Sequence, residues 1–316
     1  MPSAPPLVVI GGPTATGKTG LGVRLALALS AAGQPAEILS GDSRQVYRGM
    51  DIGTAKPTLA ERQGVPHHLL DLVEPDSLFS VASFIGAAQP VLADLAGRGS
   101  VAILVGGTGL WLRALATGLD VDASPADSAL RASLEAALVD QGLPWLAARL
   151  SSEAPIAAAR TDLRNPRRVV RALEIATLRG DGPPAAATGY GGRVLRLNLT
   201  LDPEVNRTWI EQRASGQLDG GLPEEAAQLR LRYGSQLRAL SAIGYQEAFD
   251  LLDGRIDRAG FLAVNVARNA AFARRQRTWF RVDAYGDVQQ DLDGAADPFG
   301  SALAAAQRFL ANEPVS

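Results

Sequence analysis

A glycine-rich segment near the start of the chain constrains the fold more than any other feature. Residues 12–19 read Gly-Pro-Thr-Ala-Thr-Gly-Lys-Thr and match the pattern G-x-x-x-x-G-K-[ST] at every position. The apolar run Leu7–Ile10 precedes this segment, and leucines at helical spacing follow it from Lys18 to about Ala31. A strand, a glycine-rich turn and a helix in this order predict a phosphate-binding loop; an ordinary glycine-rich turn is the alternative reading.

Each part of the predicted loop has a chemical role. Glycines let backbone N–H groups converge on phosphate oxygens at the start of a helix, Lys18 adds a mobile positive charge, and the Thr19 hydroxyl can bind Mg²⁺. We therefore predict Mg²⁺ as the cofactor and Thr19 as its ligand. The predicted diphosphate- or nucleotide-binding residues are Gly12, Pro13, Thr14, Ala15, Thr16, Gly17, Lys18 and Thr19.

The sequence lacks the usual companions of a nucleotide-hydrolysing loop. A strand that positions Mg²⁺ in such proteins ends in aspartate, but Val101–Val105 runs into Gly-Gly-Thr-Gly. Asp71 is a weak substitute for that aspartate, and the chain has no N-K-x-D guanine motif. A GTPase or a motor ATPase is therefore disfavoured.

Alternating patterns along the chain predict an α/β fold. Apolar runs typical of buried strands alternate with helical patterns such as Val81–Leu95. We predict a parallel sheet like that of P-loop NTPases, with helices on both faces and an inserted α-helical subdomain where alanine-rich helical segments replace strand signals. The further predicted strands are Glu37–Ser40, His68–Val73, Val101–Val105 and Val194–Leu201. The further predicted helices are Ala129–Leu138, Trp145–Leu150, Pro166–Arg179, Glu204–Ala214, Pro223–Tyr233, Leu240–Leu252 and Ala259–Phe280, and the stretch Gly180–Gly192 is expected to be a linker or a mobile loop. The predicted domains are residues 1–121 for the first part of the core, 122–190 for the helical insertion and 191–316 for the mostly helical completion of the core.

Composition excludes several classes of function. The chain has 316 residues and no cysteine, so thiolate metal sites, disulfides and cysteine nucleophiles are ruled out. Its N-terminal segment lacks the pattern of a signal peptide or a membrane span, so we expect a cytoplasmic protein that does not contact membranes. The formal net charge is −2, but arginines cluster at residues 164–171 and 268–281. Only Lys18 and Lys56 are lysines among the 31 basic residues.

A carboxylate follows the second predicted strand. Asp42 comes directly after Ser40-Gly41, and the carboxyl ends of neighbouring parallel strands face the same ligand crevice. Asp42 is therefore expected near the bound phosphates. A carboxylate there either binds Mg²⁺ or takes a proton from an incoming nucleophile, whereas capping of a turn is the structural alternative.

Seven blocks of sequence resemble the tRNA dimethylallyltransferase family, in the same order and over nearly the whole chain. The block of sixteen residues that begins at Asp42 is the most specific of them. The blocks are residues 12–19, 42–57 (Asp-Ser-Arg-Gln-Val-Tyr-Arg-Gly-Met-Asp-Ile-Gly-Thr-Ala-Lys-Pro), 66–71 (Pro-His-His-Leu-Leu-Asp), 106–111 (Gly-Gly-Thr-Gly-Leu-Trp), 165–174 (Asn-Pro-Arg-Arg-Val-Val-Arg-Ala-Leu-Glu), 243–245 (Ile-Gly-Tyr) and 275–281 (Arg-Gln-Arg-Thr-Trp-Phe-Arg).

The resemblance implies transfer of a dimethylallyl group from dimethylallyl diphosphate to N6 of adenosine 37, next to the anticodon of tRNA. It further implies that the glycine-rich loop holds the allylic diphosphate rather than ATP. By the same resemblance, Asp42 is the catalytic general base and Thr108 is a second catalytic residue at the reacting centre or the leaving oxygen.

The expected partners are tRNA, through its anticodon stem-loop, and dimethylallyl diphosphate. The target adenine has to leave the base stack, so splayed bases should be read by polar side chains. Solvated helix faces are the plain alternative for the arginines. The residues that the resemblance assigns to tRNA are Asp42, Ser43, Arg44, Gln45, Thr108, Arg131, Arg167, Arg168, Val169, Val170 and Arg171.

Two other functions are compatible with parts of the sequence. A small-molecule kinase shares the phosphate loop and a nearby carboxylate, but it gives no reason for the block at residues 42–57. A non-catalytic RNA-binding protein is expected to have lost Lys18, Thr19 or Asp42, and all three are present. We expect a monomer.

Overall fold

The structure is a computed structural model that describes residues 4–118, 127–183, 189–282, 285–294 and 296–314. It divides into two compact units. The first comprises residues 1–119 together with 189–316, and the second comprises residues 120–188. Each unit has an apolar core of its own, so each is described separately.

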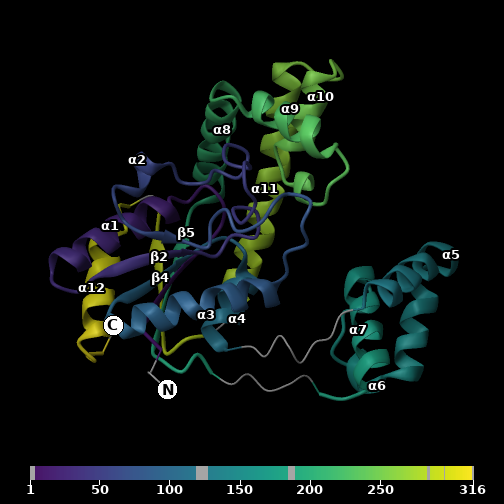
Figure 1. Cartoon of the computed structure of the whole chain (residues 1–316), viewed down its shortest axis with the longest axis horizontal. Coiled ribbons are helices and arrows are strands. Elements are labelled where there is room, and N and C mark those ends of the chain that lie inside the picture. Colours follow the sequence, from purple (N-terminus) through teal and green to yellow (C-terminus); the bar gives the residue numbers. More distant parts are fainter. Residues whose placement is uncertain (1–3, 119–126, 184–188, 283–284, 295, 315–316) are drawn as a thin grey trace. The chain divides into compact units, whose positions relative to one another are not determined.

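A six-stranded parallel sheet forms the centre of the first unit (Figure 1). Its strand order is β3-β2-β4-β1-β5-β6, so β4 lies between β2 and β1. This confirms the predicted parallel α/β fold. The strands are β1 (Leu7–Gly11), β2 (Ala36–Ser40), β3 (His67–His68), β4 (Val101–Val105), β5 (Val194–Thr200) and β6 (Val288–Asp293).

The apolar runs of the central strands follow from burial on both faces of the sheet. In β1, Leu7 and Val9 belong to one core cluster, whereas Val8 and Ile10 belong to the other. Successive side chains of a strand point to opposite faces, so a strand covered on both sides has to be apolar throughout. This pattern made β1 and β4 predictable from the sequence.

Helices cover both faces of the sheet (Figure 1). On one face, α1 (Lys18–Ala31) and α12 (Phe299–Leu310) pack on the cluster that contains Val8. On the other face, α3 (Val81–Gly97) and α4 (Gly109–Thr117) pack on the cluster that contains Leu7. The short α2 spans Leu59–Arg62.

The C-terminal part of the first unit adds a group of helices next to the sheet. The long α11 packs against α8, α10 and α4, and α9 packs against α10. Phe280 near the end of α11 reaches the core and would clash with any side chain at Gly11 of β1. The helices are α8 (Pro203–Asp219), α9 (Leu222–Tyr233), the 3₁₀ turn η1 (Ala239–Ser241), α10 (Tyr245–Leu252) and α11 (Arg258–Val282).

Three predicted elements differ from the structure. The predicted strand His68–Val73 was wrong beyond its first residue, because Leu69 and Asp71 adopt φ values of 65° and 53° that no strand accommodates. The helix expected over Leu240–Leu252 is divided by Gly244, which has a φ of 107°. The strand β6 was not predicted at all. Its sequence Val-Gln-Gln-Asp-Leu-Asp is polar because β6 is an edge strand in which every second residue is exposed.

The second unit is helical. It contains α5 (Ser128–Glu153), α6 (Pro155–Ala158) and α7 (Pro166–Arg179). The predicted segments Ala129–Leu138 and Trp145–Leu150 both lie within α5, on either side of Gly142, where the helical geometry is broken. The expected start of the insertion at residue 122 and part of the expected loop at 180–192 fall outside the described residues.

None of the described helices is both long enough and apolar enough to cross a lipid bilayer.

Candidate functional site

The ends of three neighbouring strands bring the predicted site residues of the first unit together. Residues 12–19 follow β1, Asp42 follows β2, and the turn at 106–108 follows β4, which lies between the other two. The chain passes from β1 to β2 and returns to the position between them with β4. Such a change of direction opens a crevice at the carboxyl ends of the strands, where ligands of parallel sheets bind.

The glycine-rich loop has the backbone geometry that an anion site needs. Gly12 has a φ of 144°, and a Cβ atom at this position would lie 2.4 Å from the Leu199 carbonyl oxygen. Gly17, with a φ of 81°, caps the start of α1 and provides no side chain to satisfy the first N–H groups of the helix. Unsatisfied N–H groups at a helix start carry partial positive charge and bind anions.

Lys18 lies inside this loop. Its Nζ donates to the Pro13 carbonyl oxygen at 2.5 Å, so the ammonium bends back over the loop. Burial and, to a smaller extent, the nearby Arg213 cation together lower the pKa of Lys18 to about 7, although the Asp42 carboxylate acts in the opposite direction. The site therefore contains two cations and one carboxylate close enough to influence one another.

Arg213 is a site residue that sequence reasoning missed. It comes from α8, and its guanidinium donates to Asn269 Oδ1 at 3.1 Å. Burial lowers its pKa, while the field of Asp42 raises it. The sequence predicted only a helix at residues 204–214, and no local pattern distinguishes Arg213 from Arg207, the other arginine of that helix.

Asp42 and Thr108 belong to a cluster in which hydrogen bonds join the turn after β2 to the turn after β4. Asp42 Oδ1 accepts the Arg44 N–H at 2.8 Å, which fixes the turn after β2. The Ser43 N–H donates to Thr108 Oγ1 at 3.1 Å, and the Thr108 hydroxyl donates to Ser43 Oγ at 3.3 Å. The loops after β2 and β4 are thus joined through the residue next to Asp42.

Two of the residues predicted to bind tRNA are engaged within the protein. The Arg44 guanidinium donates to the carbonyl oxygens of Arg238 and Ala239, so it anchors the segment that contains η1. Gln45 accepts from the Ser40 hydroxyl and donates to the carbonyl oxygens of Thr54 and Ala55. In this structure both side chains form hydrogen bonds with other parts of the protein.

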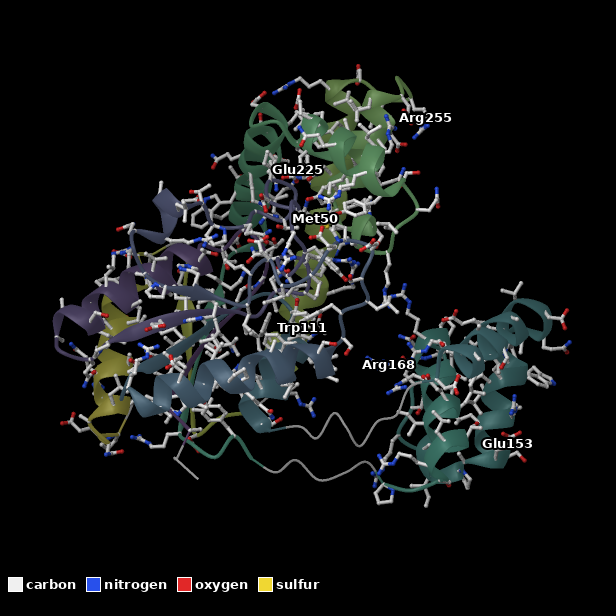
Figure 2. All side chains as sticks on the ribbon, viewed as in Figure 1. Met50, Trp111, Glu153, Arg168, Glu225 and Arg255 are labelled. Carbon is white, nitrogen blue, oxygen red and sulfur yellow. The ribbon has the colours of Figure 1, made fainter. Side chains whose placement is uncertain are left out.

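In the second unit, the predicted tRNA-binding residues fall into three groups. Arg131 and Arg171 both pair with the fully buried carboxylate of Glu174. Val169 and Val170 are buried in the core of the unit, so their side chains pack against other helices and do not face solvent. Arg167 and Arg168, in the first turn of α7, are exposed, and Figure 2 labels Arg168 there.

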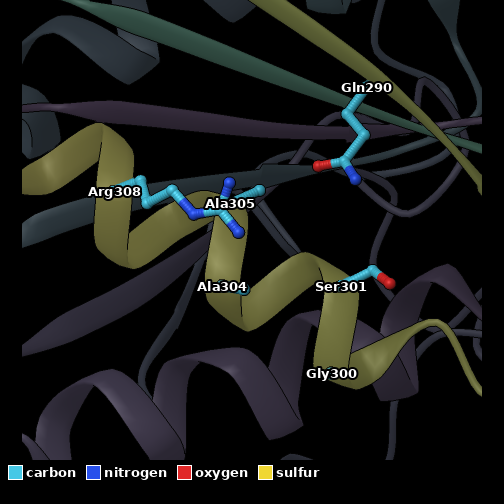
Figure 3. A pocket seen from close by; sticks show the side chains of 6 residues that line it. All are labelled: Gln290, Gly300, Ser301, Ala304, Ala305 and Arg308. Carbon is cyan, nitrogen blue, oxygen red and sulfur yellow. The ribbon is translucent and has the colours of Figure 1, made fainter. Parts of the chain in front are cut away.

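A hollow elsewhere in the first unit includes none of the predicted residues. It has a volume of about 240 Å³ and lies along α12 beside β6. Figure 3 shows Gln290 opposite Ser301 and Arg308 across this hollow. Because none of the residues that line it belongs to the candidate site, the hollow lies outside that site.

Comparison with known proteins decides the family. The model of the IPP transferase family matches residues 45–283. The chain belongs to this IPP transferase family. Among its relatives, the tRNA dimethylallyltransferase of Bifidobacterium longum is 42% identical over 88% of this chain and 84% of its own length. That of Anaeromyxobacter dehalogenans is 44% identical over 87% of this chain and 91% of its own length.

Solved structures agree with the family assignment. The tRNA isopentenylpyrophosphate transferase of Bacillus halodurans is 38% identical to this chain and matches it with a TM-score of 0.69. The match covers 97% of this chain and 95% of that protein. A eukaryotic dimethylallyltransferase acting on tRNA matches with a TM-score of 0.77 over 99% of this chain and 81% of its own. At 23% identity, this second match shows the shared fold alone.

Thr19 is the residue of this IPP transferase family member that could bind Mg²⁺. It lines a small pocket together with the side chains of Ser40, Gln45 and His67. His67 Nδ1 lies 2.8 Å from the Val65 carbonyl oxygen, and its Nε2 is buried without a hydrogen-bond partner in the described part of the chain. The pocket has room for about one water molecule, which would provide that partner. The described residues contain no cluster of three or more His, Cys, Asp or Glu side chains suited to a metal.

Proposed function

We propose that this chain is a tRNA dimethylallyltransferase that transfers the dimethylallyl group of dimethylallyl diphosphate to N6 of adenosine 37, next to the anticodon. The products are N6-(dimethylallyl)adenosine in tRNA and diphosphate. The observation that carries the proposal is a phosphate-binding loop facing Asp42, without the aspartate that nucleotide hydrolysis requires after β4, in a chain of the IPP transferase family.

The donor diphosphate binds at the start of α1. The free N–H groups there, together with Lys18 and Arg213, provide positive charge on the side where negative charge grows as the leaving group departs. Mg²⁺ on Thr19, when bound, would neutralise further charge on the diphosphate oxygens. The protein thus assists the reaction mainly by stabilising the leaving group.

The acceptor is a weak nucleophile, because the lone pair of an adenine amino group is delocalised into the ring. Alignment of N6 with the allylic carbon therefore supplies much of the rate. The N6–C1 bond forms, the C1–O bond breaks with its electron pair on the diphosphate, and the N6 proton passes to the Asp42 carboxylate. Thr108 is hydrogen-bonded to Ser43 and therefore lies beside the turn that contains Asp42.

The acceptor tRNA binds through its anticodon stem-loop. The exposed Arg167 and Arg168 carry the phosphate contacts of the second unit, because neither forms an ion pair with a carboxylate in the described residues, unlike Arg131 and Arg171. We expect the enzyme to act as a monomer, and in the cytoplasm because its tRNA substrate is there.

Nucleoside mass spectrometry tests the proposal. Unmodified tRNA is incubated with the protein, Mg²⁺ and dimethylallyl diphosphate, and a parallel sample contains ATP as the only phosphate compound. N6-(dimethylallyl)adenosine that forms only with the allylic donor supports the proposal. Turnover of ATP without a modified nucleoside would favour a P-loop small-molecule kinase instead.

A further inference from the structure

One buried amide of α11 connects two loops of the candidate site. Gln276 is 6% exposed. Its Oε1 accepts the N–H of Thr14 in the phosphate-binding loop at 2.8 Å, and its Nε2 donates to the carbonyl oxygen of Gly107 at 2.8 Å. The two loops follow different strands, β1 and β4, and Gln276 is far from both in the sequence.

The loop after β4 is shaped to receive this amide. A Cβ atom at Gly107 would lie 2.6 Å from Gln276 Nε2, and one at Gly109 would lie 2.2 Å from Trp279 Nε1. Gln276 and Trp279 are three positions apart and so lie on one face of α11. Gly107 in this loop and Gly109 at the start of α4 therefore allow α11 to approach closely enough for the amide bridge.

The bridge continues toward Asp42. Gly107 directly precedes Thr108, and Thr108 Oγ1 accepts the Ser43 N–H at 3.1 Å. Ser43 directly follows Asp42. Two side chains, those of Gln276 and Thr108, thus complete a connection from the loop that would hold the leaving group to the residue next to the proposed base.

A second group of hydrogen bonds, made by residues of α8 and α11, fixes the phosphate-binding loop. Asn206 of α8 donates to the carbonyl oxygens of Thr14 and Ala15 at 2.9 and 3.1 Å, and Arg277 donates to Asn206 Oδ1 at 3.1 Å. Ala15 has a φ of 55°, an uncommon conformation that needs such support. Because Gln276 already occupies the Thr14 N–H, the diphosphate has to be bound by later N–H groups of the loop.

We propose that Gln276 is a positioning residue that sets the distance between the diphosphate-binding loop and the Asp42–Thr108 cluster. This inference rests on the proposed function, since it assigns the two loops to the leaving group and the base. Displacement by about 1 Å in such a reaction costs roughly 100-fold in rate. Loss of the bridge should therefore lower the rate of transfer much more than it weakens binding of either substrate.

The test compares three variants with the wild type. Gln276→Met removes both hydrogen bonds at similar volume. Gln276→Glu keeps an acceptor for the Thr14 N–H but places a carboxylate against the Gly107 carbonyl oxygen. Gln89→Met changes an exposed glutamine of α3 and is the matched control. The measurements are kcat, the Kd for inorganic diphosphate, the Kd for tRNA and hydrogen exchange of a peptide that contains Thr14.

We expect kcat of Gln276→Met and Gln276→Glu to fall by about 10- to 100-fold. In Gln276→Met, both Kd values should stay within about threefold of the wild type, and the peptide that contains Thr14 should exchange faster than in Gln89→Met. An unchanged kcat in Gln276→Met overturns the proposal, as does a parallel loss of kcat, both affinities and thermal stability, which would indicate a structural role only.

The exchange measurement separates this inference from the proposed function. If the wild type transfers no dimethylallyl group, the proposed function fails. In that case, equal exchange of the Thr14 peptide in Gln276→Met and Gln89→Met overturns the bridge as well, whereas faster exchange in Gln276→Met supports its role in fixing the loop.

Discussion

At the scale of single residues, the charges around the phosphate-binding loop define what the site can bind. Lys18 and Arg213 repel each other, and Asp42 attracts both. Burial adds to the repulsion and lowers the pKa of Lys18 to about 7. A bound diphosphate would reverse this effect, since a neighbouring anion favours the charged form of a lysine. Binding of diphosphate and protonation of Lys18 are therefore coupled.

This coupling predicts how affinity depends on pH. Below pH 7, Lys18 is already protonated in the free protein, so the titration of this lysine should not make the Kd for diphosphate vary with pH. Above pH 7, the free protein must take up a proton on binding, so the Kd should rise by up to about tenfold per pH unit. Titration calorimetry of wild type and Lys18→Met between pH 6 and 9 isolates the effect, because the variant reports only the ligand's own titration. Equal pH profiles in the two proteins would contradict the coupling.

Asp42 provides the most direct residue-scale test of the chemistry. Asp42→Asn keeps an oxygen that can accept the Arg44 N–H, but an amide cannot take the N6 proton. General-base catalysis typically contributes about 10²- to 10⁴-fold, so kcat should fall by that amount while the Kd for tRNA changes by less than about threefold. Single-turnover kinetics and filter binding measure the two quantities, with Asp76→Asn in an exposed turn as control. Equal losses of binding and transfer would argue against the base.

The sequence predicted which site residues follow strands, but it assigned no contact with the loops after those strands to Arg213 or Gln276, which reach them from helices. The phosphate-binding loop, Asp42 and Thr108 each follow a strand, and parallel strands place their ends together. Arg213 and Gln276 come from α8 and α11, where the pattern of apolar residues reveals only burial. Which polar side chain of a helix reaches a loop depends on packing that no local pattern records.

At the scale of elements, the segment from Asp42 to Pro57 is irregular and is held by buried polar contacts. The Lys56 ammonium donates to the Tyr47 carbonyl oxygen and to the carboxylates of Asp51 and Asp71. From α9, Glu225, which Figure 2 labels, accepts the N–H groups of residues 51–53. These contacts replace the regular hydrogen bonds that a helix or strand would provide.

The geometry around Lys56 predicts that arginine cannot replace it. Three acceptors surround one compact ammonium whose side chain is 3% exposed, and a planar guanidinium has a different shape and size. Lys56→Arg should destabilise the first unit by about 3 kcal/mol, the lower end for a disrupted buried pair, because both aspartates are partly exposed. Urea denaturation measures the loss, with Arg207→Met in an exposed ion pair of α8 expected to cost less than about 1 kcal/mol. Equal stability of Lys56→Arg and wild type would refute this role.

Strands and helices were predictable from the sequence where burial produces a regular spacing of apolar residues. The buried strands β1 and β4 were located within a residue, and α7 was predicted with the bounds it has in the structure because Pro166 and Arg179 delimit its pattern. The edge strand β6 was not predicted, because an exposed strand has little apolar signal. The strand β3 was predicted too long, because Leu69 and its apolar neighbours pack on the core outside a strand.

At the scale of the whole molecule, the two units would contribute different parts of the reaction. The first unit contains the phosphate-binding loop and Asp42, and the second presents the exposed arginines of α7. Within the second unit, Arg131 and Arg171 share the single buried carboxylate of Glu174, whereas Arg167 and Arg168 form no ion pair in the described residues and are exposed near the start of α7.

Removal of that charge should weaken tRNA binding in a salt-dependent way. In the double variant Arg167→Gln/Arg168→Gln, the Kd for tRNA should rise, and the slope of log Kd against log salt should decrease by about one for each phosphate that an arginine no longer neutralises. Binding isotherms at several salt concentrations give this slope, and Arg179→Gln at the other end of α7 is the control. A slope identical to that of the wild type would exclude contact between these arginines and tRNA phosphates.

The measurement that tests the central claim most directly is the stoichiometry of products in one sample. The protein is incubated with Mg²⁺, unmodified tRNA and dimethylallyl diphosphate, and both inorganic diphosphate and N6-(dimethylallyl)adenosine are quantified over time. If the glycine-rich loop binds the leaving group of an allylic transfer to tRNA, one diphosphate forms for each modified adenosine, and neither product forms without tRNA. Diphosphate without modified adenosine, or orthophosphate in its place, would contradict the account.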